Sequence, residues 1–304
     1  MAGYRPGVWQ SFNPAIYLIS ILPGIGVWRL AGTGDSDQLP WLLLATLAVV
    51  LLQHAINLLN DVSDWKLGAD TEKLDSWVHF HGQNTRIATA HGWISFLLGG
   101  LLGLTVLLLS GKLWLLAIAS PMLVLGYLYN SGPRPLSYTH LGEWVTGLCY
   151  GPGVFGCLWL LGSDRVDLCA LLGMTAFAAL AMCLLLSHQP PQIETDRQAG
   201  KQSFAVRYGV QRTCLAVRLL FTLFLLTFGI ALWLASDGGT AAHAYIAAAL
   251  LAWLSVIRIS PKPVTILIPA TLVLLVAVAG QRDPLSADAP LSLPITPQAQ
   301  KTIS

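Results

Sequence analysis

Three observations predict that this chain is an all-α integral membrane protein. Apolar residues make up 55% of its 304 residues, and charged residues make up only 11%. Mean hydropathy is +0.64. A soluble domain carries roughly 25% charged residues, so this chain lacks the polar side chains that would cover a water-facing surface. The third observation is that uncharged stretches of membrane-spanning length recur along the whole chain. Together they exclude a soluble enzyme, a disordered chain and an ordinary nucleic-acid-binding protein.

Nine uncharged windows of at least 18 residues follow one another along the sequence. They cover residues 6–28, 38–60, 87–111, 113–133, 144–163, 168–193, 219–236, 238–257 and 263–281. A helix needs roughly 20 residues to cross a bilayer, and helices satisfy their own backbone hydrogen bonds in lipid. We therefore expect nine transmembrane helices, the first beginning near Pro14 and the sixth ending near Leu186.

The distribution of basic residues predicts how the helices are oriented. Nine helices place the two termini on opposite sides of the membrane. With the N-terminus in the cytoplasm, the cytoplasmic segments hold 12 Lys and Arg residues and the other side holds five. Such an excess is typical of cytoplasmic loops. We expect a protein of the inner (plasma) membrane with no cleavable signal peptide.

The chain is expected to form one helical transmembrane domain followed by a tail. The domain comprises residues 1–280. Residues 281–304 are rich in Pro, Ser and Ala and contain no long apolar stretch. We expect this last segment to be disordered.

A first long polar loop, Asp61–Arg86, follows the second window on the cytoplasmic side. If the helix continues past its apolar part, four polar residues fall at i, i+3, i+4 and i+7: Asn57, Asn60, Asp61 and Asp64. This spacing places them on one helix face. Carboxylates on one face repel unless a cation lies among them, and hard oxygen ligands suit Mg²⁺. The alternative is a solvated helix end, but the amide of Asn57 lies inside the apolar stretch and needs a partner there.

A second long polar loop, Ser187–Arg218, follows the sixth window. In it the acids Glu194 and Asp196 alternate with bases that include Lys201 and Arg207. Mixed charges at a membrane surface fit an anion that is held partly through a metal ion and partly by direct contacts with bases. The alternative is a basic loop that only enforces the topology.

Taken together, these residues resemble the UbiA superfamily of intramembrane prenyltransferases. Within it they are most similar to the 1,4-dihydroxy-2-naphthoate polyprenyltransferases of menaquinone and phylloquinone synthesis. Three motifs carry the resemblance: Asn57-x-x-Asn60-Asp61-x-x-Asp64 with Gly68-x-Asp70; Asp196-Arg197-x-x-Gly200-Lys201-x-Ser203-x-x-Val206-Arg207-x-Gly209; and Tyr127-x-Tyr129 with Gly132-Pro133-Arg134-Pro135 and Gly142-Glu143. The similarity extends from about Ser11 to Gly280, and nine helices agree with the family fold.

The resemblance implies a Mg²⁺-dependent prenyl transfer. A polyprenyl or phytyl-like chain would pass from an allylic diphosphate to an aromatic acceptor, with dihydroxynaphthoate as the leading candidate, and pyrophosphate and carbon dioxide would leave. The expected partners are therefore the polyprenyl diphosphate, the aromatic acceptor and the lipid bilayer.

The resemblance also assigns roles to individual residues. Asp61, Asp64 and Asp196 would be the metal ligands, and Asp70 would be a further ligand or would handle the proton of the acceptor. The expected contacts to the diphosphate are Asn57, Asn60, Lys201, Arg207 and Arg134. The allylic cation needs an electron-rich pocket, for which Tyr129, Tyr127 and Trp93 are candidates through cation–π contact.

One position departs from the family pattern. Gln192 stands four residues before Asp196, where the family usually has an Asp. An amide is a poorer Mg²⁺ ligand than a carboxylate, so we expect Gln192 to contact the substrate instead. Glu194 lies only two residues from Asp196 and would point elsewhere on a regular helix. Three alternatives stay open. The first is another enzyme of the same scaffold, a membrane terpene cyclase or a prenyltransferase with another acceptor. The second is a non-catalytic isoprenoid-binding member, which Gln192 favours. The third is a transporter, against which the near absence of ionisable residues in the uncharged windows argues.

Overall fold

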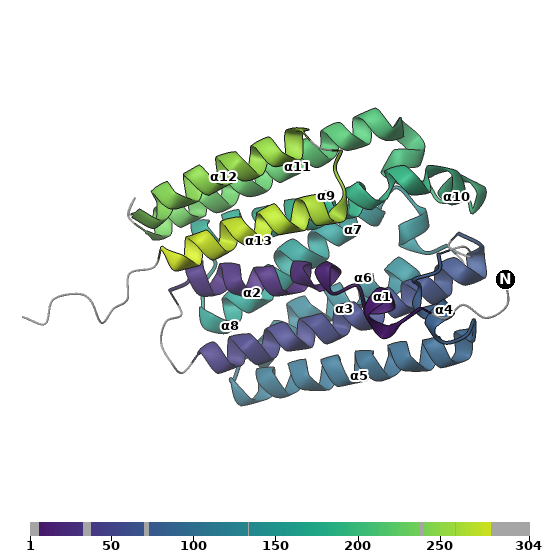
Figure 1. Cartoon of the computed structure of the whole chain (residues 1–304). Coiled ribbons are helices and arrows are strands. Elements are labelled where there is room, and N and C mark those ends of the chain that lie inside the picture. Colours follow the sequence, from purple (N-terminus) through teal and green to yellow (C-terminus); the bar gives the residue numbers. More distant parts are fainter. Residues whose placement is uncertain are drawn as a thin grey trace, which may run out of the picture.

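The structure is a computed structural model that describes residues 6–32, 38–69, 73–132, 134–236, 240–258 and 260–280. Every regular element in these ranges is helical, which confirms the predicted all-α class. Figure 1 shows long helices lying side by side in a bundle, with the short helices α4 and α10 at one end. The expected tail, 281–304, lies outside the described residues.

Eight long helices make up most of the bundle. They are α2 (Leu18–Leu30), α3 (Leu39–Leu67), α5 (Thr85–Leu109), α6 (Leu116–Asn130), α9 (Leu168–His188), α11 (Phe204–Ala235), α12 (Thr240–Arg258) and α13 (Pro263–Ala279). Shorter helices are α1 (Val8–Phe12), α4 (Trp77–Phe80), α7 (Gly142–Leu148), α8 (Gly156–Gly162) and α10 (Ile193–Gln198), and a π-helix, η4 (Cys149–Phe155), joins α7 to α8. Single 3-10 turns occur at η1 (Pro14–Tyr17), η2 (Leu113–Leu115), η3 (Leu136–Tyr138) and η5 (Pro190–Gln192).

Seven helical stretches within the described residues are long and apolar enough to cross a bilayer. They are Val8–Leu30, Leu39–Leu67, Thr85–Leu109, Leu113–Asn130, Gly142–Gly162, Leu168–Gln198 and Phe204–Ala235. The last two windows form shorter apolar helices, Ala242–Arg258 and Pro263–Ala279. At 1.5 Å per residue, each of these is about 26 Å long, a little under the ~30 Å hydrocarbon core. The expected count of nine spans is therefore not confirmed, whereas the integral membrane fold is.

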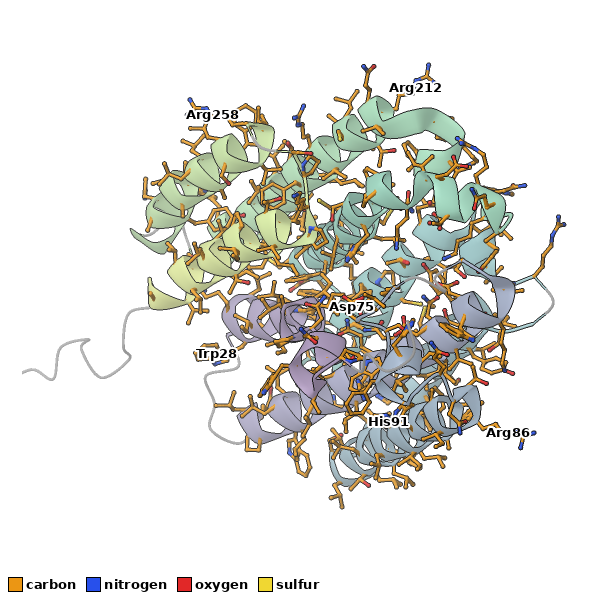
Figure 2. The ribbon with its side chains drawn as sticks, turned by 45° about the vertical axis from the view of Figure 1, so that its right-hand side comes forward. Trp28, Asp75, Arg86, His91, Arg212 and Arg258 are labelled. Atoms are coloured by element: carbon orange, nitrogen blue, oxygen red, sulfur yellow. The ribbon has the colours of Figure 1, made fainter. Side chains whose placement is uncertain are left out.

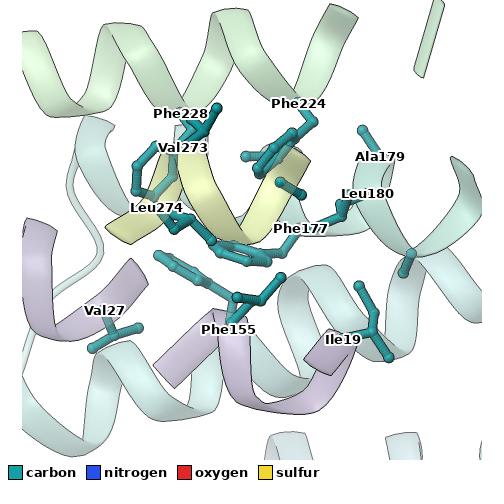
Figure 3. Packing of buried hydrophobic residues seen from close by; sticks show 14 of the residues in the cluster. Ile19, Val27, Phe155, Phe177, Ala179, Leu180, Phe224, Phe228, Val273 and Leu274 are labelled. Atoms are coloured by element: carbon teal, nitrogen blue, oxygen red, sulfur yellow. The ribbon is translucent and has the colours of Figure 1, made fainter. Parts of the chain in front are cut away.

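Aromatic side chains from three segments form the centre of the bundle (Figure 3). The rings of Phe155 and Phe177 stack with centroids 5.2 Å apart, and Phe224 and Phe228 each lie 6.1 Å from Phe177. A Cβ at Gly173 would come within 2.2 Å of the Phe155 ring, so only glycine allows this approach. Lipid offers helices no hydrophobic drive to associate, and such close packing is what joins η4, α9 and α11.

The ends of α3 and α9 place the two polar loops. The helix α3 continues past Asn60, which is the condition for placing the four polar residues on one face, and ends at Leu67, where Gly68 adopts φ +83° and terminates it. The helix α9 ends at His188, close to the expected Leu186, and the chain then passes through η5 and α10 into α11. In Figure 1, α4 and α10 lie at the same end of the bundle. The fold therefore brings both polar loops together.

Candidate active site

A cavity of about 260 Å³ lies where the two polar loops meet. The predicted site residues that line it are Asn57, Asn60, Asp61, Asp64, Tyr129, Gln192, Asp196 and Lys201. Two cavity residues, Asp64 and Asp196, are 132 positions apart in the sequence. Segments that are far apart along the chain thus contribute to one site.

The two carboxylates of α3 are buried, and each one is hydrogen-bonded. Asp64 is only 1% exposed and accepts hydrogen bonds from the Asn60 amide at 2.9 Å and the Tyr138 hydroxyl at 2.9 Å. Asp61 accepts from Lys73 Nζ at 3.0 Å and from the backbone N–H of Trp77 at 2.8 Å. Buried charges are tolerated only with such partners. The second pair of bonds also folds the loop before α4 against the end of α3.

Lys201 joins the two acidic motifs. Its Nζ lies 3.0 Å from Asp64 Oδ2 and 3.8 Å from Asp196 Oδ1. Gly200 adopts φ +76°, and the turn it makes lets the Lys201 backbone N–H donate to the carbonyl of Asp196 at 2.8 Å. Ser203 donates to Asp196 Oδ2 at 2.9 Å. An ammonium group thus holds carboxylates from α3 and α10 on either side of it.

The position that departs from the family pattern lies in the cavity wall. Gln192 lines the cavity at the start of α10. Glu194 does not replace the missing carboxylate, because it is exposed and pairs with Arg197 at 3.0 Å. The prediction that Glu194 points elsewhere is confirmed. Within the described residues, Asp196 is therefore the one acid of α10 that faces the cavity.

Several other predicted residues lie away from the cavity. Arg134 and Arg207 are exposed and are absent from its lining, and Arg207 packs on the ring of Tyr208 at 4.9 Å. Trp93 and Tyr127 pack against each other on the outside of the bundle, 40% and 43% exposed, whereas Tyr129 faces inward. Asp70 lies outside the described residues.

A buried acid that the motifs did not assign to the site holds the second motif in place. Glu143 is 5% exposed, and its Oε1 accepts from the Gln189 amide at 3.0 Å and from the Phe204 backbone N–H at 2.8 Å. Gln189 in turn accepts from the Ala205 backbone N–H at 3.1 Å. These bonds tie the end of α9 and the start of α11 to α7. A lone acid at the start of a long uncharged window was the sequence signal for this role.

Two apolar cavities continue from the polar one. The first, about 190 Å³, shares Ile56, Asn57 and Tyr129 with it. The second, about 220 Å³, shares Gly126 and Tyr150 with the first and lies between α3, α5 and α6. The series has a charged end and an apolar end, so it suits an amphipathic molecule with a charged head.

The residues fit a magnesium ion that is bound together with a ligand. Within the described ranges, no three Asp, Glu, His or Cys side chains converge closely enough to hold an ion alone. Mg²⁺ is usually held by one or two carboxylates together with phosphate oxygens and water. Asp61, Asp64 and Asp196 line one cavity and are separated by lysine side chains, so they match this second kind of site.

Comparison with known proteins finds relatives that are all named as prenyl- or phytyltransferases. The profile of the UbiA prenyltransferase family matches residues 17–264. A 1,4-dihydroxy-2-naphthoate octaprenyltransferase of Bacillus subtilis is 27% identical over 261 residues, which cover 84% of this chain and 79% of that protein. One of the same name from Mycobacterium tuberculosis is 34% identical over 195 residues, 60% of this chain and 65% of that protein. A 2-carboxy-1,4-naphthoquinone phytyltransferase of Synechocystis is 30% identical over 208 residues, 66% of each.

The solved structures agree with the fold. A UbiA homolog from Archaeoglobus fulgidus, bound to DMAPP and Mg²⁺, has a TM-score of 0.61 and 18% identity, and the match covers 89% of this chain and 97% of that chain. The family profile covers most of the membrane domain, including both acidic motifs. The predicted resemblance is confirmed, and the chain belongs to the UbiA prenyltransferase family.

Proposed function

We propose that this chain transfers a polyprenyl or phytyl-like chain from an allylic diphosphate to 1,4-dihydroxy-2-naphthoate. The reaction is Mg²⁺-dependent and releases pyrophosphate and carbon dioxide. The observation that carries the proposal is the single cavity in which both acidic motifs meet and which continues into apolar space. The relatives named for naphthoate or naphthoquinone acceptors support the choice of acceptor.

The charged end of the cavity binds the diphosphate in this proposal. Asp61, Asp64 and Asp196 hold Mg²⁺, which when bound supplies Lewis-acid stabilisation of the leaving pyrophosphate. Lys201 and Lys73 already lie beside these carboxylates, at 3.0 Å in both cases, so they are placed to donate to phosphate oxygens as well. A Lys ammonium suits this role because it is a compact charge on a flexible stem.

The apolar end binds the isoprenoid in this proposal. The reacting carbon then lies near Tyr129, at the junction of the polar and apolar cavities. The ring of Tyr129 stabilises the allylic cation through cation–π contact. The surrounding apolar walls exclude water, which would otherwise capture the cation as an alcohol.

We also infer that the end of the bundle with α4 and α10 faces the cytoplasm. The bases of the two polar loops gather there, and the excess of basic residues on that side supports this orientation. Figure 2 shows Arg86 and Arg212 extending away from the helices. A cysteine introduced at exposed Glu194 would react with a membrane-impermeant maleimide only from the cytoplasmic side.

The test is product formation by the purified full chain in liposomes. Geranylgeranyl diphosphate or a longer allylic diphosphate is supplied with Mg²⁺ and 1,4-dihydroxy-2-naphthoate. Parallel reactions contain 4-hydroxybenzoate or no acceptor. A prenylated, decarboxylated naphthoquinol is the expected product, and its formation must stop when Mg²⁺ is chelated.

The same experiment separates the alternatives that Gln192 leaves open. An isoprenoid product without an acceptor would identify a terpene cyclase. Prenylated 4-hydroxybenzoate would identify a different acceptor. Diphosphate binding without turnover would identify a non-catalytic binding protein, and it would make Gln192 the first position to revert.

A further inference from the structure

Four ring side chains connect the cavity to the loop that contains α4. The Tyr17 hydroxyl, which lines the cavity, lies 2.6 Å from His54 Nδ1. His54 Nε2 lies 3.4 Å from His91 Nε2, and His91 Nδ1 lies 3.2 Å from His81 Nε2. We call these four residues the histidine chain. They come from η1, α3, α5 and the end of α4, so four separate segments are needed to build it.

Each inner ring of the histidine chain uses both of its nitrogens. A neutral imidazole has one N–H donor and one acceptor nitrogen. One set of tautomers satisfies every contact: Tyr17 donates to His54, His54 donates to His91, and His91 donates to His81. When a proton enters at Tyr17 and another leaves at His81, each ring exchanges one N–H for the other, and no ring keeps a charge.

The outer end of the histidine chain is built to stay neutral. Burial, and in second place the neighbouring His91, lower the pKa of His81 below its usual value near 6.5. At pH 7 the His81 ring is therefore a neutral acceptor. It is half-buried at the edge of the loop and so lies between the cavity and the solution.

Aromatic rings shield the histidine chain from water. The Trp77 ring lies 5.0 Å from that of His54 and 5.3 Å from that of His91. The Phe12 ring stacks on Tyr17 at 4.5 Å. In Figure 2, Arg86 extends away from the bundle, whereas His91, on the same helix, lies among the helices. The three histidine rings are half-buried and partly covered by aromatic side chains, so the contacts between the rings give a proton a route made of side chains.

The other ionisable groups near the histidine chain are few among the described residues. Asp61 and Tyr150 are the ionisable neighbours of the Tyr17 hydroxyl, which also has a side-chain hydrogen bond with Asn57. The charge of Asp61 is offset by Lys73 at 3.0 Å. His79, although close in sequence, turns to the Ser76 hydroxyl and the Trp65 ring instead.

We propose that the histidine chain carries a proton between the acceptor in the cavity and the solution beside α4. This inference rests on the proposed function. As the acceptor carbon that carries the carboxylate attacks, its bond to the prenyl carbon forms and the bond from that carbon to the diphosphate oxygen breaks. The neighbouring ring hydroxyl gives its proton to the Tyr17 oxygen, while Tyr17 gives its own proton to His54 and the transfer continues to His81. When carbon dioxide leaves, the electron pair of its bond to the ring forms the ring double bond again, the carbonyl π pair moves to the ring oxygen, and a proton comes back to that oxygen along the same residues.

The benefit of this route is a dry cavity. The allylic cation reacts with any water that reaches it, yet the acceptor has to lose and regain a proton during the same reaction. A path made of side chains meets both needs. Tyr17 is the member that touches the acceptor, and His54, His91 and His81 act through it.

The test is His91→Phe, which interrupts the middle of the histidine chain and keeps a ring against Trp77. Because proton transfer by a positioned group typically contributes 10²–10⁴-fold, we expect kcat to fall roughly 100-fold, with the KM for the prenyl diphosphate unchanged. The solvent deuterium isotope effect on kcat should also change. His140→Gln, at an exposed histidine outside the histidine chain, is the matched control and should behave as wild type.

A second variant separates proton transfer from a structural role. In His91→Gly, added imidazoles should restore the rate, and the restored rate should rise with the pKa of the imidazole used. His81→Gln, at the half-buried end, serves if the His91 variants fail to fold. If kcat and the isotope effect are unchanged in His91→Phe, the proton-transfer inference is wrong while the proposed function still holds. The same follows if the restored rate in His91→Gly does not depend on the pKa of the added imidazole. Absence of any naphthoquinol from the wild-type chain would overturn the proposed function and the proton step with it.

Discussion

The two acidic motifs are built in different ways. The first lies on α3, an unbroken helix of 29 residues, and places two buried carboxylates on adjacent turns. The second lies on α10, a six-residue helix between a proline-containing turn and Gly200, and presents Asp196 with the neutral Gln192 beside it. The long helix α3 thus contributes two carboxylates to the cavity, and the short helix α10 contributes one. Under the proposed function, we expect the first motif to contribute more of the binding energy for the metal and phosphates.

The short second motif depends on groups outside itself. Lys201 links Asp196 to Asp64, and Glu143 anchors the start of α11 through the Phe204 backbone N–H. A six-residue helix is too short to be stable by itself in water. The position of Asp196 is therefore set by side chains from α7 and α3, and the two motifs are coupled rather than independent.

The largest effect is expected from Asp64→Asn. The amide keeps the shape but removes the charge that Lys201, Tyr138 and Asn60 converge on. We expect kcat/KM for the prenyl diphosphate to fall about 1,000-fold, the upper range for loss of one strong electrostatic contact. Naphthoquinol formation in liposomes at saturating Mg²⁺ measures it. Glu194→Gln, at an exposed acid of the second motif, is the control and should leave the rate unchanged.

A smaller loss is expected from Asp196→Asn in the same assay. Asp196 contributes the only carboxylate that its motif brings to the cavity within the described residues, but Asp61 and Asp64 stay in place. We expect a loss of about 100-fold, the lower range for a single electrostatic contact. If kcat/KM falls equally in Asp64→Asn and Asp196→Asn, the two motifs contribute equally and the proposed difference between them is wrong.

The sequence predicted the first motif better than the second because a helix has a fixed period. Once α3 continues past Asn60, the spacing alone places Asn57, Asn60, Asp61 and Asp64 on one face. The helix period also predicts that Glu194, two residues from Asp196, points in another direction, and Glu194 is exposed and paired with Arg197 in the structure. Long uncharged windows likewise located the helices, although charge alone did not show that the last two helices are short.

What the sequence did not predict comes from contacts between distant segments. Tyr138 reaches Asp64 through the packing of η3, and Glu143 holds Gln189 and Phe204 through the packing of α7; the sequence marks Glu143 as a lone acid but does not give these partners. Arg134 and Arg207 were placed at the site by family motif, yet their side chains are exposed in this structure. Long basic side chains at a membrane surface have many rotamers, so a motif fixes where their backbone lies but not where their charge lies.

Glu143→Ala tests whether the second motif is held from outside. The change leaves the Phe204 backbone N–H and the Gln189 amide without their acceptor, which should cost about 2 kcal/mol of folding stability. Thermal denaturation in detergent measures the loss. The Mg²⁺ concentration for half-maximal rate should also rise, because Asp196 is no longer fixed. A lowered melting temperature with an unchanged Mg²⁺ requirement would show that α10 holds its own position. Glu194→Ala controls for loss of an acid.

Gln192→Asp should make the second motif more similar to the first, because both would then bring two carboxylates to the cavity. It adds a carboxylate to the cavity wall four residues before Asp196, on the same side of α10. Affinity of oxygen sites for divalent cations rises with the number of charged ligands, so we expect the half-maximal Mg²⁺ concentration to fall roughly fivefold. A Mg²⁺ titration of the initial rate measures it, with Gln192→Asn as the uncharged control. An unchanged or higher Mg²⁺ requirement would mean that a carboxylate at this position does not reach the ion.

Gly103→Leu should have the smallest effect and extends the comparison to the isoprenoid end. The apolar cavity beyond Tyr129 is lined mainly by α3, α5, α6, η4 and α8, and α3 is also the helix that carries the first motif. A Cβ at Gly103 would meet only Ala48 at 3.7 Å, so a leucine there fits the helix and projects into the cavity. A pocket discriminates by a few kcal/mol at most per group, and we expect geranylgeranyl diphosphate to lose roughly threefold in kcat/KM relative to geranyl diphosphate. Ala247→Leu, on an exposed face of α12, adds a similar volume away from this cavity and should leave kcat/KM unchanged for both donors. If both variants change the ratio of kcat/KM for the two donors by the same factor, the isoprenoid does not lie in this cavity. The first motif would then bind only the diphosphate end of the substrate.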